Sequence, residues 1–390
     1  MKLQKRTLTQ PNSPIGAHEH LLKDIPEDRP LLDLSQGAPG FAPAPEVQER
    51  MAAIARDPDG SRYGPIRGLD HLREALLDDL RSDYGGNLTV DDVCITAGCN
   101  QAFAMVVNAI AAPGDEVILT VPYYFNHDMW LGLEGLSAVY LEPADGLNPT
   151  VGEAEALVTE RTRALVLITP GNPTGNVLTP DRLAEFAAFA ERRDIVLVID
   201  ETYRSFVPGS QAPHELFAGE RWREHVVSLH SFSKDLAIPG QRVGAIVGSP
   251  ELLVEVTKLI DCVTICPPRI GQEAAHAGLT QAAEWRDAMV ADIAAKQAYF
   301  EKVMATNPGG FTLRSAGAYY GWVEHPFQKT PTSEIVEKLL LEQGILTIPG
   351  DAFMKHDANM LRFSFANIEI ERLDELADRL TEFSSSRTAT

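Results

Sequence analysis

Seven short runs rich in β-branched residues constrain the fold of this chain more than any other feature of its sequence. Most of them are apolar at nearly every position, as expected for strands buried on both faces. Helix-like stretches separate the runs, and the stretch at residues 179–193 begins with Thr179 as a helix cap followed by Pro180. This alternation predicts an α/β fold with a mainly parallel, seven-stranded sheet. The predicted strands are residues 93–96, 116–121, 137–142, 164–169, 195–200, 226–231 and 243–248.

One connection breaks the alternation. Only residues 232–242, which include Pro239 and Gly240, join the last two predicted strands. A parallel crossover needs about a dozen residues or more, usually with a helix. We therefore expect residues 243–248 to form the one antiparallel strand of the sheet.

The length of the chain favours a second domain. Single hydrophobic cores rarely grow beyond about 250–300 residues, and this chain has 390. After about residue 250 the helices become longer, and the segments 311–325 and 360–366 then predict two strands of a smaller α+β domain. The predicted parts are a Pro-rich N-terminal segment packing on the small domain (1–45), a large ligand-binding domain (46–275) and a small C-terminal domain (276–390).

Charge and cysteine content narrow the range of partners. The net charge of −21 argues against a surface that binds nucleic acid or anionic membranes. No apolar run reaches the roughly 18 residues of a membrane span, and the N-terminal stretch lacks the apolar centre of a signal peptide. The four cysteines form no C-x-x-C pair, which favours free thiols in a reducing compartment. We expect a cytoplasmic protein.

Polar side chains follow the carboxyl ends of the predicted strands. In open α/β sheets these ends share one edge, and ligands bind there. The segments in question are residues 97–100, 122–127, 170–175, 200–205 and 231–235. Together they carry Asn100, Tyr124, His127, Asn172, Asp200, Tyr203 and Lys234. The sequence therefore predicts one binding site at this edge.

Two common kinds of ligand fit this edge poorly. No strand is followed by G-x-G-x-x-G and no G-x-x-x-x-G-K-[ST] occurs, which disfavours dinucleotides and nucleoside triphosphates. His18 and His20 lie in predicted coil, and His127 has no histidine four residues further on. We therefore predict no metal site.

The remaining chemistry is that of an amine bonded to an aldehyde. Lys234 can form a Schiff base when its amine is neutral, and burial or nearby cations lower the pKa of a lysine toward that state. Asp200, at the end of a buried strand, can hold a pyridine nitrogen protonated, which makes the ring an electron sink. Asn172 and Tyr203 can hydrogen-bond the phenolic oxygen of such a ring, and Tyr124 can stack on it.

The loop at residues 231–242 and the helix that begins after residue 97 offer donors to a phosphate on the same ligand. Hydroxyl and guanidinium groups hydrogen-bond phosphate, and the amide groups of a helix N-terminus favour an anion. The predicted phosphate-binding residues are Gly98, Cys99, Asn100, Ser231, Ser233 and Arg242.

In their joint spacing these residues resemble the class I/II aminotransferases of the fold-type I pyridoxal-phosphate enzymes. The matching pieces are Asn172 in PGNPTG, Asp200 and Tyr203 in DETY, Lys234 in SFSK and Arg242 eight residues later. The resemblance runs from about residue 36 to residue 366. It implies an aminotransferase that uses pyridoxal 5′-phosphate, bound to Lys234 as a Schiff base, to move an amino group from an L-amino acid to a 2-oxo acid. Lys234 would also carry the proton that moves between substrate and cofactor.

The same resemblance assigns roles outside the central motifs. Arg362 matches the arginine that binds the substrate carboxylate, and Gly37 matches a backbone position beside that carboxylate. His127 matches a histidine that supports Asp200. Tyr63 matches a tyrosine that reaches the phosphate in the neighbouring subunit, so a homodimer is implied.

The sequence departs from the family pattern in two places. Cys99 stands where the family commonly has Ser, Gly or Ala, and the glycine that often follows Phe353 is absent. Arg269, close to the expected subunit boundary, could neutralise a distal substrate carboxylate or could be an ordinary surface arginine. The natural amino donor and acceptor stay open.

Two other functions remain as alternatives. The same four residues, Asn172, Asp200, Lys234 and Arg242, serve other pyridoxal-phosphate reactions, so a β/γ-lyase, a synthase or a side-chain cyclase fits them as well. A non-catalytic cofactor-sensing module of this fold is the third possibility. The absence of a helix-turn-helix or basic extension before the domain, and the negative charge, disfavour it.

Overall fold

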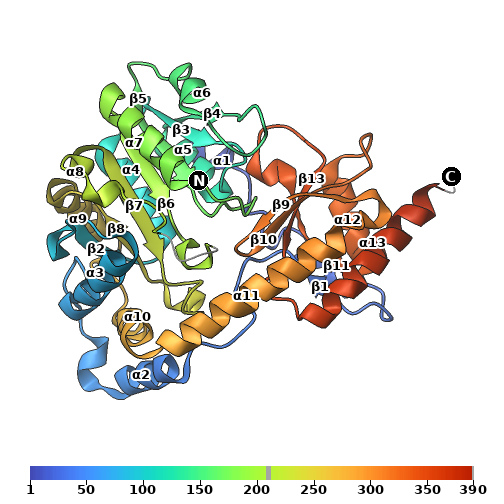
Figure 1. The fold of residues 1–390 in the computed structure, drawn as a ribbon, viewed down its shortest axis with the longest axis horizontal. Coiled ribbons are helices and arrows are strands. Elements are labelled where there is room, and N and C mark those ends of the chain that lie inside the picture. The colour runs from blue at the N-terminus through green and yellow to red at the C-terminus, as the bar shows by residue number, and fades with distance from the viewer. Residues whose placement is uncertain (208–211, 389–390) are drawn as a thin grey trace.

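A seven-stranded sheet organises the larger part of the computed structural model, which describes residues 1–207 and 212–388. Its strands are β2 (Val93–Thr96), β3 (Glu116–Thr120), β4 (Ser137–Leu141), β5 (Thr162–Ile168), β6 (Val196–Asp200), β7 (Val226–Ser231) and β8 (Gly244–Val247). They follow the order β2-β8-β7-β6-β5-β3-β4 (Figure 1). β8 is antiparallel to β2 and β7, and the other neighbouring strands are parallel. The predicted fold class, with one antiparallel strand, is confirmed.

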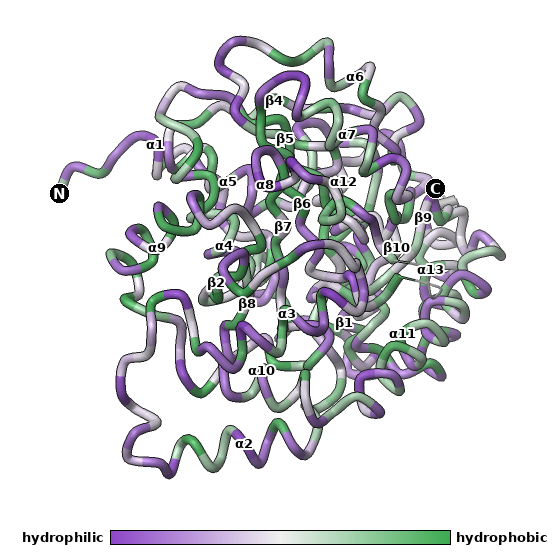
Figure 2. The backbone as a smooth tube through the Cα atoms, turned by 60° about the vertical axis from the view of Figure 1, so that its left-hand side comes forward, coloured by the Kyte–Doolittle hydropathy of each residue, from purple (hydrophilic) through white to green (hydrophobic). Residues whose placement is uncertain are grey.

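Helices cover both faces of this sheet because its strands are apolar on both faces. Successive side chains of a strand point to opposite faces, so Leu165 and Leu197 belong to one hydrophobic cluster, whereas Val166 and Val198 belong to the other. The helices of the first cluster are α3 (Asp70–Tyr84), α7 (Pro180–Arg193) and α10 (Arg269–Gln281), and those of the second are α4 (Cys99–Ile110), α5 (Phe125–Glu134) and α9 (Pro250–Thr264). Figure 2 shows the hydrophobic residues along the central strands, and mixed residues along the outer helix α2 (Pro45–Arg56).

The predicted helix at residues 179–193 is α7, and Thr179 caps it. The Thr179 hydroxyl accepts a hydrogen bond from the Arg182 amide at 3.2 Å, and Pro180 occupies the first helical position. Shorter helices α6 (Val151–Glu155) and α8 (Trp222–His225) lie in the connections after β4 and before β7.

A second, four-stranded antiparallel sheet lies in the C-terminal part. Its strands are β9 (Thr312–Gly317), β10 (Tyr320–Glu324), β12 (Ile348–Pro349) and β13 (Met360–Ser364), in the order β12-β13-β10-β9. The prediction of a single strand at residues 311–325 is wrong, because this segment folds back as a hairpin at Ala318 and Tyr319. Ala318 takes the turn with a left-handed φ of 49°. Neither Ala nor Tyr is typical of a turn, and the only turn-forming residue beside the reversal is Gly317, which still belongs to β9.

Helix α11 (Ala283–Met304) connects the two sheets. It starts beside α10 and runs to the small sheet (Figure 1), where Phe300 packs against Phe363 and Phe365. Helices α12 (Thr332–Gln343) and α13 (Leu373–Thr388) complete this part. Within the described part of the chain, no helix combines the length and the apolar character needed to cross a bilayer.

The N-terminal segment contacts both parts of the molecule. Strand β1 (Leu32–Asp33) pairs in parallel with β11 (Ile345–Leu346) in the C-terminal part. Helix α1 (Lys5–Leu8) lies against α5 in the large part. The residues between α1 and α2 therefore pass the carboxyl edge of the large sheet, which brings Ile15 and Gly37 to the site described next.

Candidate functional site

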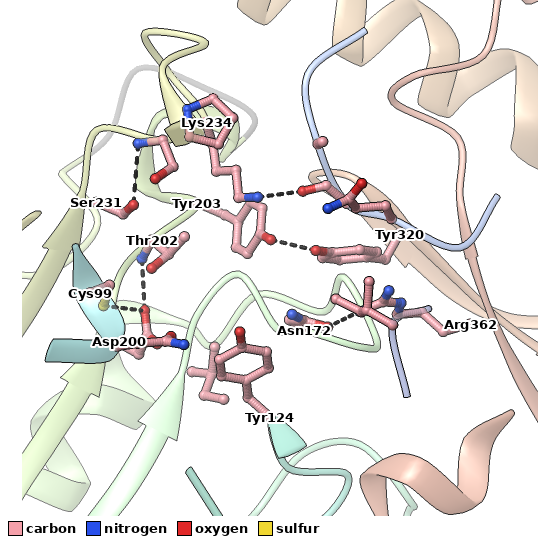
Figure 3. A pocket seen from close by; sticks show the side chains of 18 of the residues that line it. Cys99, Tyr124, Asn172, Asp200, Thr202, Tyr203, Ser231, Lys234, Tyr320 and Arg362 are labelled. Atoms are coloured by element: carbon pink, nitrogen blue, oxygen red, sulfur yellow. Dashed lines mark hydrogen bonds between the residues drawn. The ribbon is translucent and has the colours of Figure 1, made fainter. Parts of the chain in front are cut away.

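A cavity of about 330 Å³ opens at the carboxyl edge of the large sheet (Figure 3). Strand ends, the N-terminal segment and the small sheet all contribute to its wall. The predicted site residues in this wall are Gly37, Cys99, Asn100, Tyr124, Asn172, Asp200, Tyr203, Ser231, Ser233, Lys234, Arg242 and Arg362. The five predicted strand ends thus meet at one site, as the strand-end rule requires.

Lys234 presents its amine to this cavity from the loop after β7. The Nζ atom donates a hydrogen bond to the Gly37 carbonyl oxygen (Figure 3). Burial, together with the positive charges of Arg362 and Arg242, lowers the Lys234 pKa from 10.5 to about 8. A substantial fraction of the amine is therefore neutral, and thus nucleophilic, at mildly alkaline pH.

Asp200 ends β6 as a carboxylate that is only 5% exposed. Its Oδ1 accepts hydrogen bonds from the Thr202 amide at 3.0 Å and from the Cys99 thiol at 3.7 Å, and its Oδ2 lies 3.4 Å from His127 Nε2. Burial alone would raise the Asp200 pKa, but the His127 contact and the Thr202 hydrogen bonds outweigh it and leave the pKa below its ordinary value. Asp200 is thus held as an anion at the floor of the cavity.

His127 lies behind Asp200 and does not line the cavity. It is 2% exposed, and its ring stacks on Phe103 with the centroids 3.9 Å apart. The Tyr124 ring meets the His127 ring edge-on at 5.2 Å and forms part of the cavity wall. Packing of these three rings fixes the imidazole that faces the Asp200 carboxylate.

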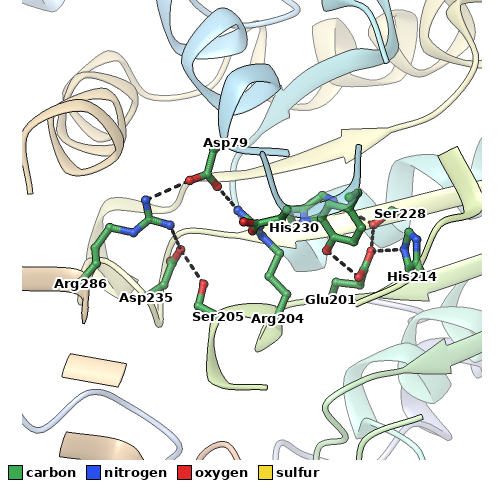
Figure 4. Close-up of polar contacts among 11 residues, drawn as sticks. Asp79, Glu201, Arg204, Ser205, His214, Ser228, His230, Asp235 and Arg286 are labelled. Carbon is green, nitrogen blue, oxygen red and sulfur yellow. Dashed lines mark hydrogen bonds and ion pairs between the residues drawn. The ribbon is translucent and has the colours of Figure 1, made fainter. Parts of the chain in front are cut away.

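The chain after Asp200 is anchored by a buried polar network (Figure 4). Glu201 accepts a hydrogen bond from the Tyr84 hydroxyl at 2.7 Å and others from Ser228 and His214. Arg204, in a 3₁₀ turn at Arg204–Phe206, donates to Asp79 and Asp83. Since Asp79, Asp83 and Tyr84 all belong to α3, that helix holds the segment that carries Asp200 and Tyr203.

The same network reaches the residue after Lys234. Arg286, in the first turns of α11, donates to Asp79 Oδ1 at 3.0 Å and lies 4.0 Å from Asp235 Oδ2. The Ser205 hydroxyl donates to the same Asp235 oxygen at 3.4 Å. The segment that carries Asp200 and the segment that carries Lys234 are therefore both fixed by contacts outside the cavity.

Arg362 is the second cation of the site, and it lies on β13. The side chain is 1% exposed; Nη1 donates to Asn172 Oδ1 at 3.0 Å, and Nη2 donates to the Ser35 carbonyl oxygen. The guanidinium also lies over the Tyr320 ring at 4.7 Å and the Phe353 ring at 5.1 Å. A planar donor group fixed in this way can receive a carboxylate through two parallel hydrogen bonds.

Tyr320 is a wall residue that sequence reasoning missed. Its hydroxyl pairs with the Tyr203 hydroxyl, and both side chains are almost fully buried. A Cβ at Gly37 would overlap the Tyr320 hydroxyl, which explains the need for glycine there. The sequence showed two adjacent tyrosines on a predicted strand, but without the strand register it gave no means to decide which of them faces the site. Ile15, Gln36, Ala38 and Thr202 are further wall residues without a sequence signal.

The opposite end of the cavity is built for an anion. Gly98 caps α4 with φ 88°, and a Cβ at this position would meet Arg242 Nη2 at 2.5 Å. The first amides of α4 and the Arg242 guanidinium therefore converge on one place. Ser231 and Ser233 lie beside them, and the Ser231 hydroxyl accepts from the Ser233 amide at 3.2 Å.

Besides His127 and Gly98, which lie directly behind the cavity wall, Tyr63 and Arg269 lie outside it. Tyr63 is 75% exposed on the surface of the chain. Arg269 begins α10, with its Nε 3.9 Å from Glu273 Oε1. Neither residue contacts the cavity of its own subunit, so any role of theirs in a site requires a second copy of the chain.

The donor set fits a phosphorylated aldehyde with a basic ring nitrogen. A neutral amine can bind the aldehyde carbon, a buried carboxylate can face the ring nitrogen, and a glycine-capped helix with an arginine can hold the phosphate. Within the described ranges, no group of His, Cys, Asp and Glu side chains could hold a metal ion.

Comparisons with known proteins agree with this geometry. A family model for aminotransferase class I and II matches residues 29–380. The chain is 29% identical to an aspartate aminotransferase of Pyrococcus abyssi, over 90% of each chain. It is 28% identical to aromatic-amino-acid aminotransferase 2 of Thermococcus litoralis, over 91% of this chain and 94% of the relative. Among solved structures, a mutant of Thermus thermophilus aspartate aminotransferase matches with a TM-score of 0.89 and 25% identity, over 98% of this chain and 100% of that one.

Proposed function

The chain belongs to the aminotransferase class I and II family, and we propose that its transamination depends on Lys234 as the residue that binds the cofactor covalently and moves the proton. It is a pyridoxal-5′-phosphate-dependent enzyme that exchanges an amino group between an amino acid and a 2-oxo acid. The observation that carries the proposal is the Lys234 amine, which faces the cavity with a pKa of about 8, with Asp200 on the same wall.

The cofactor supplies an aldehyde that takes up the amino group and a ring that accepts electrons. Lys234 Nζ, when neutral, accepts the proton released from the α-carbon of the substrate and returns it on the other side of the exchange. Asp200 would hold the ring nitrogen of the cofactor in its protonated form, and the His127 contact, which helps to lower the Asp200 pKa, keeps Asp200 ionised for this purpose.

The other wall residues hold and orient the two ligands. Asn172 and Tyr203 would hydrogen-bond the phenolic oxygen of the ring, and Tyr124 would pack against its face. Arg362 binds the α-carboxylate of the substrate and fixes the α-carbon within reach of Lys234. The residues that would hold the phosphate are Gly98, Cys99, Asn100, Ser231, Ser233 and Arg242.

We also propose a cytoplasmic homodimer. Tyr63 is a large aromatic residue with most of its surface exposed, and its loop is joined to the loop before α10 by a hydrogen bond from the Gly64 amide to Cys266 Sγ at 3.3 Å. Val263, in the last turn of α9, and Ile265, at the start of the latter loop, are also exposed. An exposed apolar cluster of this kind is typical of an interface, and the family resemblance implies that Tyr63 reaches the phosphate site of the second copy.

A half-reaction experiment tests the function. Loaded enzyme is mixed with one amino acid in the absence of any 2-oxo acid, and the visible absorbance and the products are followed. We expect one equivalent of 2-oxo acid per site and an absorbance change that persists until a 2-oxo acid is added. Continuous release of ammonia or of a cyclised product, with recovery of the starting absorbance, would instead identify a lyase or a cyclase.

A further inference from the structure

Tyr320 contacts both Tyr203, the proposed cofactor contact, and Arg362, the proposed carboxylate-binding residue. Its hydroxyl pairs with the Tyr203 hydroxyl, and its ring lies under the Arg362 guanidinium at 4.7 Å. Tyr320 is 1% exposed at the start of β10, and the Tyr203 side chain comes from the loop after β6. One phenol thus joins the proposed carboxylate site on the small sheet to the proposed cofactor contact on the large sheet (Figure 3).

The direction of the hydrogen bond between the two phenols decides which proton is free for a ligand. Each hydroxyl has one proton, so only one of them can donate to the other. If Tyr320 donates to Tyr203, the Tyr203 proton remains available to the cavity. If Tyr203 donates to Tyr320, Tyr203 has no proton left for the cofactor.

The charges above the rings favour donation by Tyr320. A cation over the face of a phenol stabilises the electron-rich ring and makes its hydroxyl a better donor. Arg362 is a permanent cation 4.7 Å from the Tyr320 ring centroid, whereas Lys234 Nζ lies 5.9 Å from the Tyr203 centroid and loses its charge when its amine is neutral. Tyr320 is therefore the better donor of the pair.

We propose that Tyr320 is a positioning residue that directs the Tyr203 proton toward the cofactor and couples this donation to carboxylate binding at Arg362. The inference rests on the proposed function, which places the carboxylate at Arg362 and the phenolic oxygen of the cofactor at Tyr203. A carboxylate bound to Arg362 neutralises the cation above the Tyr320 ring and so weakens the hydrogen bond that Tyr320 donates to Tyr203. This in turn changes how strongly the Tyr203 hydroxyl can donate its own proton. By linkage, the state of Tyr203 also changes the affinity of Arg362 for a carboxylate.

The direct test uses cofactor-free protein with ¹³Cζ-labelled tyrosine. The signals of Tyr203 and Tyr320 are assigned by their loss in Tyr203→Phe and Tyr320→Phe, and propanoate is the carboxylate probe. In the unsubstituted protein we expect propanoate to move both signals in one titration. In Tyr320→Phe, which keeps the ring under Arg362, the Tyr203 signal should no longer respond. In Arg362→Gln neither signal should respond.

A kinetic test of the loaded enzyme separates positioning from stability. Tyr320→Phe should lower kcat about fivefold, the effect of one weakened hydrogen bond, with a smaller change in KM from the lost coupling to Arg362. Tyr140→Phe is the control, because it also removes one hydrogen-bonded hydroxyl, from a tyrosine outside the cavity wall whose hydroxyl donates to Asp128 Oδ1 at 2.6 Å. The stability of this control variant should fall by an amount similar to that of Tyr320→Phe. Its kcat should change less than the kcat of Tyr320→Phe.

Two results would overturn the inference. One is a Tyr203 signal that follows propanoate equally with and without the Tyr320 hydroxyl, and the other is equal kcat for Tyr320→Phe and the unsubstituted enzyme. If Tyr320→Phe does not fold, the unsubstituted protein alone decides: a Tyr203 signal that does not move when propanoate is added is sufficient to reject the inference. None of these NMR results depends on bound cofactor, so failure here is distinct from failure of Lys234 to bind the cofactor.

Discussion

The Arg362 guanidinium donates a hydrogen bond to the Asn172 side-chain oxygen at 3.0 Å, across a separation of 190 residues. Arg362 lies on a strand of the small sheet, and Asn172 follows a strand of the large sheet. The proposed carboxylate site therefore exists only when both parts of the chain are folded against each other. A second contact of Arg362, with the Ser35 carbonyl oxygen, adds the N-terminal segment to this requirement.

Substitution of Arg362 tests this arrangement. Arg362→Lys keeps the charge but loses the planar pair of donors, so we expect KM for amino acids to rise roughly ten- to a hundredfold, with cofactor binding largely kept. Steady-state kinetics and the visible absorbance of the loaded protein measure the two effects separately. Loss of cofactor with an unchanged KM would show that Arg362 serves the cofactor and not the substrate.

The Lys234 pKa predicts how cofactor uptake depends on pH. The folded pKa is lowered to about 8, and only the neutral amine attacks an aldehyde, so the rate of covalent uptake should rise with pH, with a midpoint near 8, and level off above it. Stopped-flow absorbance of cofactor-free protein mixed with cofactor measures this rate. Arg362→Gln should move the midpoint upward, because it removes one of the cations that lower the pKa. A midpoint near 10.5 in the unsubstituted protein would contradict the burial of the amine.

Protonation of Glu201 should lower the free energy of unfolding at acid pH. Burial opposes its ionisation, but His214, His230 and Ser228 outweigh that effect and lower its pKa from 4.5 to about 2. Because the folded pKa is depressed, the stabilisation is present above about pH 4.5 and is lost as pH falls toward 2. Its size is on the order of 3 kcal/mol. Urea unfolding at several pH values should show Glu201→Gln less stable at pH 7 and less sensitive to acid; equal curves for both proteins would rule out this role.

Removal of Arg204 should destabilise the protein and weaken cofactor binding together. Arg204→Met leaves Asp79 with only Arg286 and leaves Asp83 without its guanidinium partner, a type of change that costs about 3–5 kcal/mol in a buried network. Thermal unfolding and cofactor titration measure the two effects. Arg221→Met, which removes an exposed arginine bound to Glu191 and Glu224, is the control and should change little. Similar melting temperatures for both variants would argue against the anchoring role of α3.

Most of the fold could be predicted because the large sheet is buried on both faces. Its strands appear in the sequence as apolar runs, and the short link before β8 revealed the antiparallel strand. The turn at Ala318 and Tyr319 was missed because neither residue type marks a turn and a single adjacent glycine, Gly317, was the one signal of it. Strand β1 escaped prediction because two residues give no periodicity, and its pairing with β11 joins residues more than 300 positions apart.

The candidate site was only partly accessible from the sequence. Asp200 ends a strand, and Asn172 and Lys234 follow strands, so the strand-end rule brought them together without a structure. Arg362 and Gly37 lie in other parts of the chain and were reached only through a family resemblance. Tyr320 was missed because only the folded turn shows which of two adjacent tyrosines lines the cavity and pairs its hydroxyl with Tyr203. Tyr63 is exposed on its own subunit, so its predicted contact with a phosphate needs the site of a second subunit.

The most direct test of the account is to locate the covalent bond between protein and cofactor. Loaded protein is reduced with borohydride, digested and analysed by mass spectrometry, with Lys234→Ala treated in the same way. We predict that the reduced cofactor is found on the peptide that contains Lys234, and that the variant carries none. Cofactor mass on a different lysine, or an unchanged visible absorbance in Lys234→Ala, would contradict the central claim.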